Sequence, residues 1–143
     1  MFTLTEQPIE RTALIKQCKD VQCGGFVSFE GWVRDHNHGQ KVSHLVYEAY
    51  PELAIKEGQC VIAEALEKFA IQKAHCVHRT GHLDLQDIAV WVGVSAAHRD
   101  AAYQASQYII DEIKARVPIW KKEFYQDGQI SWVNCPRCQQ AHA

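Results

Sequence analysis

The segment from Ser95 to Val133, SAAHRDAAYQASQYIIDEIKARVPIWKKEFYQDGQISWV, decides the fold class of this chain. Apolar or small residues recur in it at spacings of three and four, which predicts one buried stripe along a helix. The stripe consists of Ala102, Ser106, Ile109, Ile113 and Val117. We expect Ser95 to cap the start of the helix. Pro118 lacks an N–H group and disfavours helical backbone at Val117, so the helix should end there.

The residues after Pro118 have the pattern of a β-hairpin. Residues 119–125 are typical of a strand, and residues 130–133 return as its partner. Between them, Asp127-Gly128 favours the positive φ angles of a two-residue turn.

The upstream chain alternates irregularly between strand and helix patterns. We expect strands at 1–4, 26–34, 42–50 and 74–79, one or two more within 83–94, and helices at 9–19 and 52–69. The second helix should bury a stripe of Ile55, Ile62, Leu66 and Phe69. Gly58 weakens this helix by about 1 kcal/mol relative to Ala, unless close packing requires it.

The polar segment 35–40 reads as a loop that pairs strands 26–34 and 42–50 as a hairpin. Such a loop would display Arg34 at a strand end, where functional side chains are common. Its two histidines, His36 and His38, are expected to be exposed rather than to bind metal.

Together these patterns predict a single α+β domain. The chain has 143 residues, 47% of them hydrophobic, which is enough for one core and too little for two. The order of elements lacks strict βαβ alternation, and the hairpins imply antiparallel pairing. We expect about three helices and mainly antiparallel strands within residues 1–134, followed by a flexible tail at 135–143.

The overall charge argues against several classes of partner. A net charge of −2 gives no general attraction to nucleic acid or to an anionic membrane. The longest apolar run, residues 88–94, suits a buried strand rather than a membrane span, and the N-terminal residues resemble no targeting leader. We therefore expect a cytoplasmic protein that binds neither nucleic acid nor membrane.

The six cysteines are expected to be reduced thiols. Cys18, Cys60 and Cys76 fall in apolar patterns and should be small core residues. Cys135 and Cys138 form a Cys-x-x-Cys pair, which is half of a zinc site. Completing it would need Cys18 and Cys23, or His142, to come close, so a metal-free tail is the favoured interpretation.

His98 and Arg99 lie at the predicted start of the long helix. Unpaired N–H groups make this end electropositive, so added cations are unfavourable there unless an anion is bound. A phosphate could be held by the backbone and by both side chains. The alternative is a solvated, charged first turn, and these two residues alone do not decide between them.

Three lysines lie close to Pro118 in the sequence: Lys114 before it, and Lys121 and Lys122 after it. A lysine flanked by apolar residues loses hydration, which lowers its pKa and suits it to act as an acid, base or nucleophile. Lys121 and Lys122 also fit an edge strand protected against aggregation, and Lys114 fits a cation that complements the helix dipole. On chemistry alone these ordinary roles are favoured.

Seven short blocks, taken together, are more specific. They are FEGWVRDHN (29–37), YEAYP (47–51), HRTG (78–81), VSAAHR (94–99), IDEIK (110–114), PIWKKE (118–123) and WV (132–133). In this order, over roughly residues 24–133, they resemble the catalytic (large) subunit of molybdopterin synthase, including its F-x-G-x-V-R-x-x-N pattern. Segment 81–87 departs from the family pattern G-x-L-x-x-G-[DE], because Gln86 stands where the second glycine is expected. The strand connection there is therefore expected to differ.

The resemblance implies both an assembly and a reaction. Family members have an α/β hammerhead-like fold, form a homodimer, and bind one small ubiquitin-like sulfur carrier per protomer, which gives a heterotetramer. They are sulfurtransferases that convert cyclic pyranopterin monophosphate into molybdopterin in molybdenum cofactor biosynthesis. The sulfur comes from a thiocarboxylate on the carrier's C-terminal Gly-Gly tail, so the resemblance implies neither a cofactor nor a nucleophilic cysteine.

The resemblance also assigns roles to individual residues. It implies that Arg34, His98 and Arg99 hold the substrate phosphate, in a site completed across the dimer. Lys114 and Lys121 match the catalytic lysines, and Lys122 and Glu123 would support them. Phe29 matches a pocket position that the Gly-Gly tail or the pterin could contact.

Two other functions remain open at this stage. A non-catalytic module that binds a phosphate ligand would need Arg34, His98 and Arg99 but neither Lys114 nor Lys121. A zinc-binding accessory protein would instead depend on Cys135 and Cys138.

Overall fold

Two β-sheets organise the fold, and the computed structural model describes them within residues 1–133. The first sheet has the order β1 (Phe2–Thr5), β5 (Lys73–Arg79), β7 (Ile88–Ala96) and β2 (Gly25–Trp32). The second has the order β3 (His36–Asn37), β4 (Gln40–Ala49), β8 (Ile119–Tyr125) and β9 (Ile130–Val133), and β6 (Gly81–Asp84) also pairs with β4.

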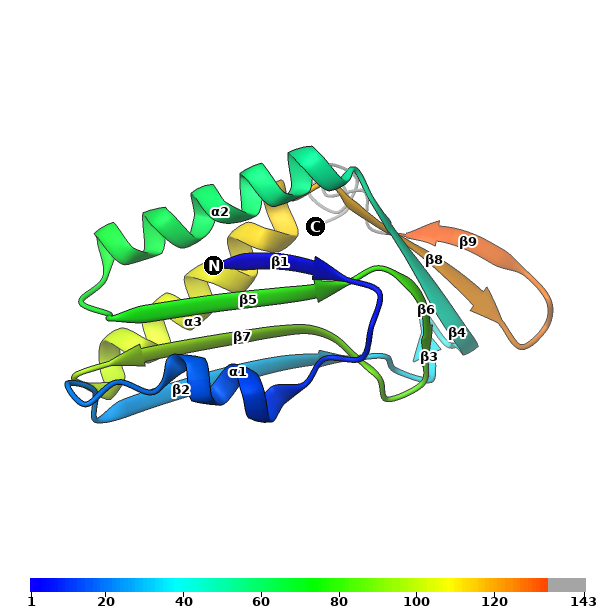
Figure 1. Ribbon diagram of the computed structural model, residues 1–143. Coiled ribbons are helices and arrows are strands. Elements are labelled where there is room, and N and C mark those ends of the chain that lie inside the picture. Colours follow the sequence, from blue (N-terminus) through cyan, green and yellow to red (C-terminus); the bar gives the residue numbers. More distant parts are fainter. Residues whose placement is uncertain (134–143) are drawn as a thin grey trace.

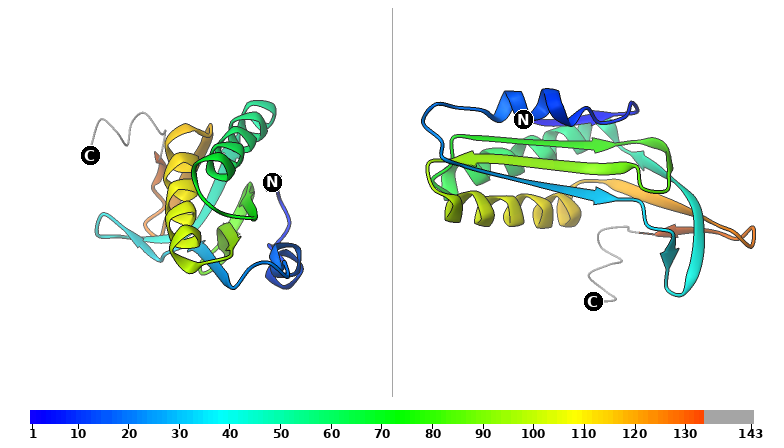
Figure 2. Two further views of the ribbon diagram at one scale, coloured as in Figure 1. Left: turned by 90° about the vertical axis from the view of Figure 1, so that its left-hand side faces the viewer. Right: turned by 90° about the horizontal axis from the view of Figure 1, so that it is seen from below.

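Three helices complete the domain: α1 (Arg11–Cys18), α2 (Pro51–Lys68) and α3 (Arg99–Arg116). Figure 1 shows α2 and α3 running along the first sheet, and they contact each other there. Figure 2 shows α1 on the opposite side of this sheet from α3. Among the described strands only β1 and β5 pair in parallel, so the predicted single α+β domain with mainly antiparallel strands is confirmed.

The main core lies between the first sheet, α2 and α3. Every member of the stripe predicted for α3 is buried, which confirms the helical periodicity. A Cβ atom at Gly58 would collide with the ring of Phe2, so this glycine allows α2 to approach β1 closely. The close packing considered for Gly58 is therefore present.

The start of α3 differs from the prediction. Ser95 does not cap the helix, because it lies within β7 and pairs with Phe26 of β2 and Lys73 of β5. His98 takes the N-cap position, without a side-chain hydrogen bond. Strand β7 continues two residues beyond position 94, because pairing with β2 and β5 on its two sides stabilises Ser95 as strand rather than as a helix cap.

The stripe predicted for α2 was wrong in part. Ile62 is buried, but Ile55 and Leu66 are 41% and 43% exposed. The buried face instead carries mostly small residues: Ala54, Gly58, Val61, Ile62 and Ala65. This face of α2 packs closely against β1 and α3, so its residues must be small. A search for periodic large apolar residues therefore does not identify it.

The hairpin predicted between strands 26–34 and 42–50 is absent. β2 pairs with β7, whereas β4 pairs with β6 and β8 in the other sheet. The intervening polar segment makes its own small hairpin, in which β3 returns into β4. Its two-residue turn is formed by His38 and Gly39, with φ angles of 50° and 79°, the positive pair of a type I′ turn.

The predicted turn at Asp127-Gly128 also has a different form. The Tyr125 N–H donates to the carbonyl of Gln129 at 2.9 Å, so three residues form the loop rather than two. Of these three, only Gly128 has a positive φ, 87°. This is the three-residue hairpin connection with one left-handed glycine.

The connection between β6 and β7 contains the unusual residue of segment 81–87. Gln86 adopts a φ of 71°, although it is not a glycine. Its N–H donates to the carbonyl of Val33 at 2.8 Å, and the N–H of Val33 donates to the carbonyl of Asp87 at 3.1 Å. The turn therefore uses left-handed backbone at the position where the family pattern has glycine.

The cysteines divide into buried and exposed groups. Cys18 and Cys76 are buried as predicted, and burial raises the pKa of their thiols to about 11 and about 12. Cys60 was predicted to be a core residue but is exposed, because it lies on the outer face of α2. Cys135 and Cys138 lie outside the described residues, and within 1–133 no three His, Cys, Asp or Glu side chains group as a metal site.

The helices of the described part lack the length and apolar character needed to cross a membrane.

Candidate active site

The end of α3 and the start of β8 bring two of the predicted lysines together. Val117 and Pro118 end the helix and turn the chain back as β8, so Lys114 lies in the last turn and Lys121 lies on the adjoining strand. The pKa of Lys114 is lowered by loss of hydration and then by the positive charges of Lys121 and Arg34. Three cationic side chains thus share one region.

Glu123 is the buried carboxylate of this region, with a side chain only 1% exposed, and Asp111 lies near Lys114 as a second carboxylate. Its Oε1 atom accepts a 2.7 Å hydrogen bond from Asn37 Nδ2, and Lys121 Nζ lies 3.3 Å from the same oxygen. The Oε2 atom is buried and has no hydrogen-bond partner among the described residues. Sequence reasoning gave Asn37 no role, although it is the last residue of the 29–37 block.

Two small cavities adjoin these groups. One, of about 60 Å³, is lined by residues that include Tyr47, His78 and Lys114. The other, of about 50 Å³, is lined by residues that include Arg34, Asn37, Tyr47, Lys121 and Glu123. Tyr47 lines both, so it separates the region around Lys114 from the region around Lys121.

Two side chains that are neutral near pH 7, Tyr47 and His78, lie next to these cations. Burial and then the negative charge of Glu123 raise the pKa of Tyr47 to about 12. Burial lowers the pKa of His78 to about 4, and its Nδ1 lies 2.8 Å from the carbonyl oxygen of Arg79. The rings of Tyr47 and His78 meet edge to face, 5.0 Å between centroids. Near pH 7 the excess charge of the region therefore comes from its lysines and Arg34.

Two further predicted residues lie around this cluster rather than in it. Lys122 points to the opposite face of β8, where its Nζ lies 5.3 Å from the ring centroids of both Phe124 and Trp132. Phe29 lies on β2 and lines an open groove of about 400 Å³ together with Lys114. Phe29 thus shares a surface with one catalytic candidate, whereas Lys122 does not.

His98 and Arg99 are separated from the cluster by the length of α3. Both are exposed at its N-terminal end, and Lys114 follows Arg99 fifteen positions later. The rise of an α-helix places these positions roughly 22 Å apart. One chain therefore brings together Arg34, Lys114, Lys121 and Glu123, but not His98 and Arg99.

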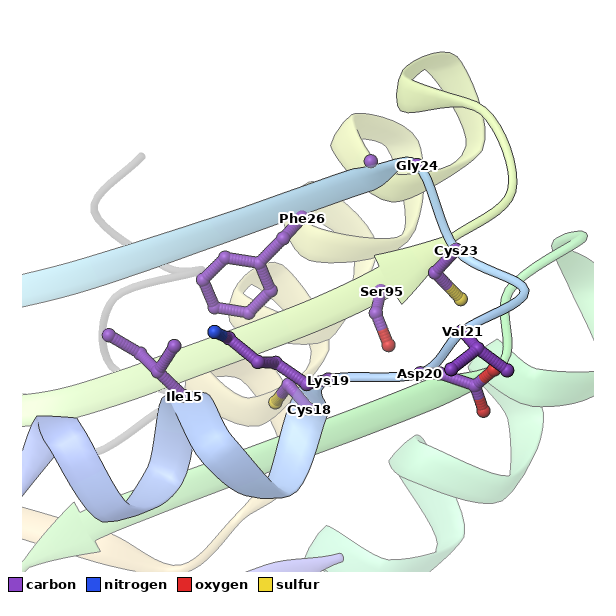
Figure 3. Close-up of a pocket in the computed structure, with 10 residues that line it drawn as sticks. Ile15, Cys18, Lys19, Asp20, Val21, Cys23, Gly24, Phe26 and Ser95 are labelled. Atoms are coloured by element: carbon purple, nitrogen blue, oxygen red, sulfur yellow. The ribbon is translucent and has the colours of Figure 1, made fainter.

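A further pocket, beside α1, contains none of the predicted catalytic or substrate-binding residues. It has a volume of about 470 Å³ and lies between α1, the loop after it and the first sheet (Figure 3). Its lining includes Cys18, Cys23 and Ser95, and the buried Oγ of Ser95 has no hydrogen-bond partner within residues 1–133. Its lining also includes the charged residues Lys19 and Asp20.

Comparison with known proteins identifies the family. A family model described as MoaE protein matches residues 4–116. The chain belongs to the MoaE protein family. A MoaE relative, the molybdopterin synthase catalytic subunit of Pyrococcus abyssi (strain GE5 / Orsay), is 46% identical over 114 residues, which cover 80% of this chain and 76% of that protein.

Solved structures show the same MoaE fold. The crystal structure of molybdopterin synthase from Staphylococcus aureus matches with a TM-score of 0.86 and 37% identity, over 91% of this chain and 94% of that one. A complex of subunits 1 and 2 of molybdopterin-converting factor from Helicobacter pylori 26695 matches with a TM-score of 0.74 over 94% and 89% of the two chains. At 16% identity, the second likeness concerns the fold alone.

Proposed function

We propose that this chain is the catalytic subunit of a molybdopterin synthase. In this reaction, sulfur passes from a carrier thiocarboxylate to cyclic pyranopterin monophosphate and forms the dithiolene of molybdopterin. The observation that carries the proposal is the cluster of Arg34, Lys114 and Lys121 around one buried carboxylate, Glu123. Three cations beside two carboxylates, Glu123 and Asp111, still leave positive charge that a phosphate or thiocarboxylate would neutralise.

The two lysines differ in ways that suit proton transfer. Loss of hydration and the neighbouring positive charges lower the pKa of Lys114, which makes its proton easier to release than that of an ordinary lysine. Lys121 Nζ instead lies 3.3 Å from Oε1 of Glu123. Two lysines in different surroundings on either side of Tyr47 suit the proton transfers that accompany C–S bond formation and departure of the acyl oxygen.

The thiols contribute little to this chemistry. The raised pKa values of Cys18 and Cys76 keep both protonated near neutral pH, and a protonated thiol is a poor nucleophile. This agrees with a carrier protein as the source of sulfur. No cofactor is needed for the transfer.

The phosphate site requires a second copy of the chain. Because α3 separates Arg99 from Lys114 by roughly 22 Å, His98 and Arg99 would join Arg34 from the partner protomer of a homodimer. β2 is an edge strand of the first sheet, and its Phe26, Phe29 and Trp32 are 41%, 38% and 61% exposed. Such an edge supports association between copies.

The sulfur carrier would bind each protomer, which gives a heterotetramer in the cytoplasm. The Helicobacter pylori complex, which has this fold, contains two subunits of molybdopterin-converting factor. A C-terminal Gly-Gly tail could lie along the open groove beside Phe29 and reach the cavity of about 60 Å³ beside Lys114, because glycine has no side chain.

Reconstitution tests the function. The purified chain is mixed with a small carrier ending in Gly-Gly thiocarboxylate and with cyclic pyranopterin monophosphate, and dithiolene product is measured. The same carrier with an ordinary carboxylate is the control. Product is expected from the thiocarboxylate alone, and its absence in both reactions would exclude the function.

A further inference from the structure

We propose that Asn37 is a positioning residue of this site, acting through Glu123 on Lys121. The inference rests on the proposed function, since Lys121 is a catalytic candidate there. It concerns a residue that neither composition nor resemblance linked to the chemistry.

The contacts form a chain of three side chains from two separate parts of the sequence. Asn37 Nδ2 donates to Glu123 Oε1 at 2.7 Å, and Lys121 Nζ lies 3.3 Å from that same oxygen. Oε2 has no partner within the described residues, so both of these contacts converge on one oxygen. Tyr125 also lies beside this carboxylate, and burial, then the charge of Glu123 and a side-chain hydrogen bond with it, raise the pKa of the tyrosine. Of the two contacts at Oε1, the one from Asn37 is the shorter, and without it Lys121 would face a less firmly held carboxylate.

The amide group also constrains the chemical state of Glu123. The NH₂ of an asparagine only donates, so the oxygen that it contacts must act as an acceptor. A carboxylate buried to this extent needs such partners, because burying a charge without hydrogen bonds is costly. Asn37 thereby supplies one of the hydrogen bonds that the buried Glu123 side chain needs beside Lys121.

The backbone around Asn37 fixes it in place. The turn at His38 and Gly39 closes the β3–β4 hairpin directly after it. At the base of this hairpin, the N–H of Val42 donates to the carbonyl of Asp35 at 2.8 Å, and Lys41 accepts from the N–H of Gln126 at 2.9 Å. The hairpin is thus tied to the strand pair that carries Lys121 and Glu123.

The test is a double-mutant comparison in single-turnover sulfur transfer at saturating substrate. Asn37→Ala should lower the rate about tenfold or more, while the dissociation constants of substrate and carrier change less than twofold. In a Lys121→Ala background, Asn37→Ala should lower the rate by less than a further twofold, because Asn37 acts on the rate through Lys121, which is already absent. Asn37→Gln keeps the amide but displaces it by one methylene, and should lose rate as well.

Ser43→Ala is the matched control. It removes another hydrogen bond between β4 and β8, from Ser43 Oγ to the carbonyl of Phe124 at 3.0 Å, without touching Glu123. This variant should keep the wild-type rate. Wild-type rates in both Asn37 variants, or a full additional loss in the Lys121→Ala background, would overturn the positioning role.

A measurement independent of activity separates this inference from the proposed function. In ¹⁵N spectra of lysine-labelled protein, the Nζ signal of Lys121, assigned with Lys121→Arg, should be visible in the wild type and in Ser43→Ala. It should broaden or disappear in Asn37→Ala. An unchanged signal would contradict the inference, even if the wild type made no dithiolene and the proposed function failed.

Discussion

Arg116 on α3 donates two hydrogen bonds to Glu64 on α2, at 2.7 and 2.9 Å, from the two terminal nitrogens of its guanidinium group. Tyr108 donates to the same carboxylate at 2.6 Å. Arg116 lies two residues after Lys114, so this contact fixes the helical turn that presents the lysine. Hydrogen bonds from Arg116 and then Tyr108 lower the pKa of Glu64 from its ordinary 4.5 to about 2.

This contact predicts a stability difference that depends on pH. A carboxyl group whose pKa is depressed on folding adds stability above its unfolded pKa, and this is lost as pH falls through the folded value. Glu64→Gln should therefore lower the Tm at pH 6–7, and the deficit should shrink between pH 4.5 and 2. Thermal unfolding across this range checks it. Glu67→Gln, an exposed change on the same helix, should show no such dependence.

Gln86→Gly should stabilise the protein. Left-handed backbone costs an ordinary residue roughly 1–2 kcal/mol relative to glycine, although glycine also gains freedom in the unfolded chain. We expect a net gain of about 0.5–1 kcal/mol in the free energy of unfolding, measured with urea. Gln86→Ala is the control and should give no such gain, because alanine is as strained as glutamine at a positive φ. A loss of stability in Gln86→Gly would show that the side chain of Gln86 contributes more to stability than its backbone strain costs.

Gly58→Ala should destabilise the protein, although alanine is the better helix former. The gain of about 1 kcal/mol in helix propensity is outweighed by overpacking against Phe2, which costs typically 1–3 kcal/mol. The variant should therefore unfold at lower urea. In a Phe2→Leu background, which lacks the ring, Gly58→Ala should lower the free energy of unfolding by less than it does in the wild type. If the two substitutions instead lower it additively, the clash with the Phe2 ring is not the cause.

Lys121→Ala should separate catalysis from binding. It should retain carrier binding and most substrate affinity, yet lose about 10²-fold or more in single-turnover transfer. Lys121→Arg should not restore the rate, because a guanidinium group stays protonated and cannot exchange the proton. Near-wild-type rates in both variants would leave Lys114 as the remaining lysine candidate.

Arg99→Ala should weaken substrate binding by about 1.5–3 kcal/mol, which is typical of a hydrogen bond to a charged group, and calorimetry measures it. If Arg99 acts across the dimer, mixing it with Lys121→Ala should restore activity. Each mixed dimer would contain one intact site, so random assembly should recover about a quarter of the wild-type activity. No recovery in mixtures shown to exchange protomers would mean that each site takes Arg99 and Lys121 from the same protomer.

Local patterns in the sequence predicted the parts of the fold that depend on local rules. The stripe of α3 and its end at Pro118 were confirmed, because periodicity and proline geometry act within a few residues. The pairing of β2 with β7 could not be predicted this way, since the partners are about sixty residues apart. The tight turn at His38 and Gly39 was missed because histidine adopts positive φ only occasionally.

The candidate site, like the fold, could be predicted from local sequence only in part. Chemistry alone favoured ordinary roles for Lys114 and Lys121, and only the resemblance marked them as catalytic candidates. Their proximity to Arg34 depends on how the two sheets meet. The contact between Asn37 and Glu123 spans 86 residues and exists only after β4 and β8 have paired, so no local signal could have revealed it.

The length of α3 limits how this protein can evolve. The helix separates Arg99 from Lys114 by a fixed number of residues, and each added or deleted residue would rotate everything beyond it by about 100° and shift it by about 1.5 Å. A one-residue insertion would turn Lys114 away from Lys121 while leaving the helix intact. Changes in chain length are therefore tolerable in surface turns such as residues 126–128 but not between the two ends of α3.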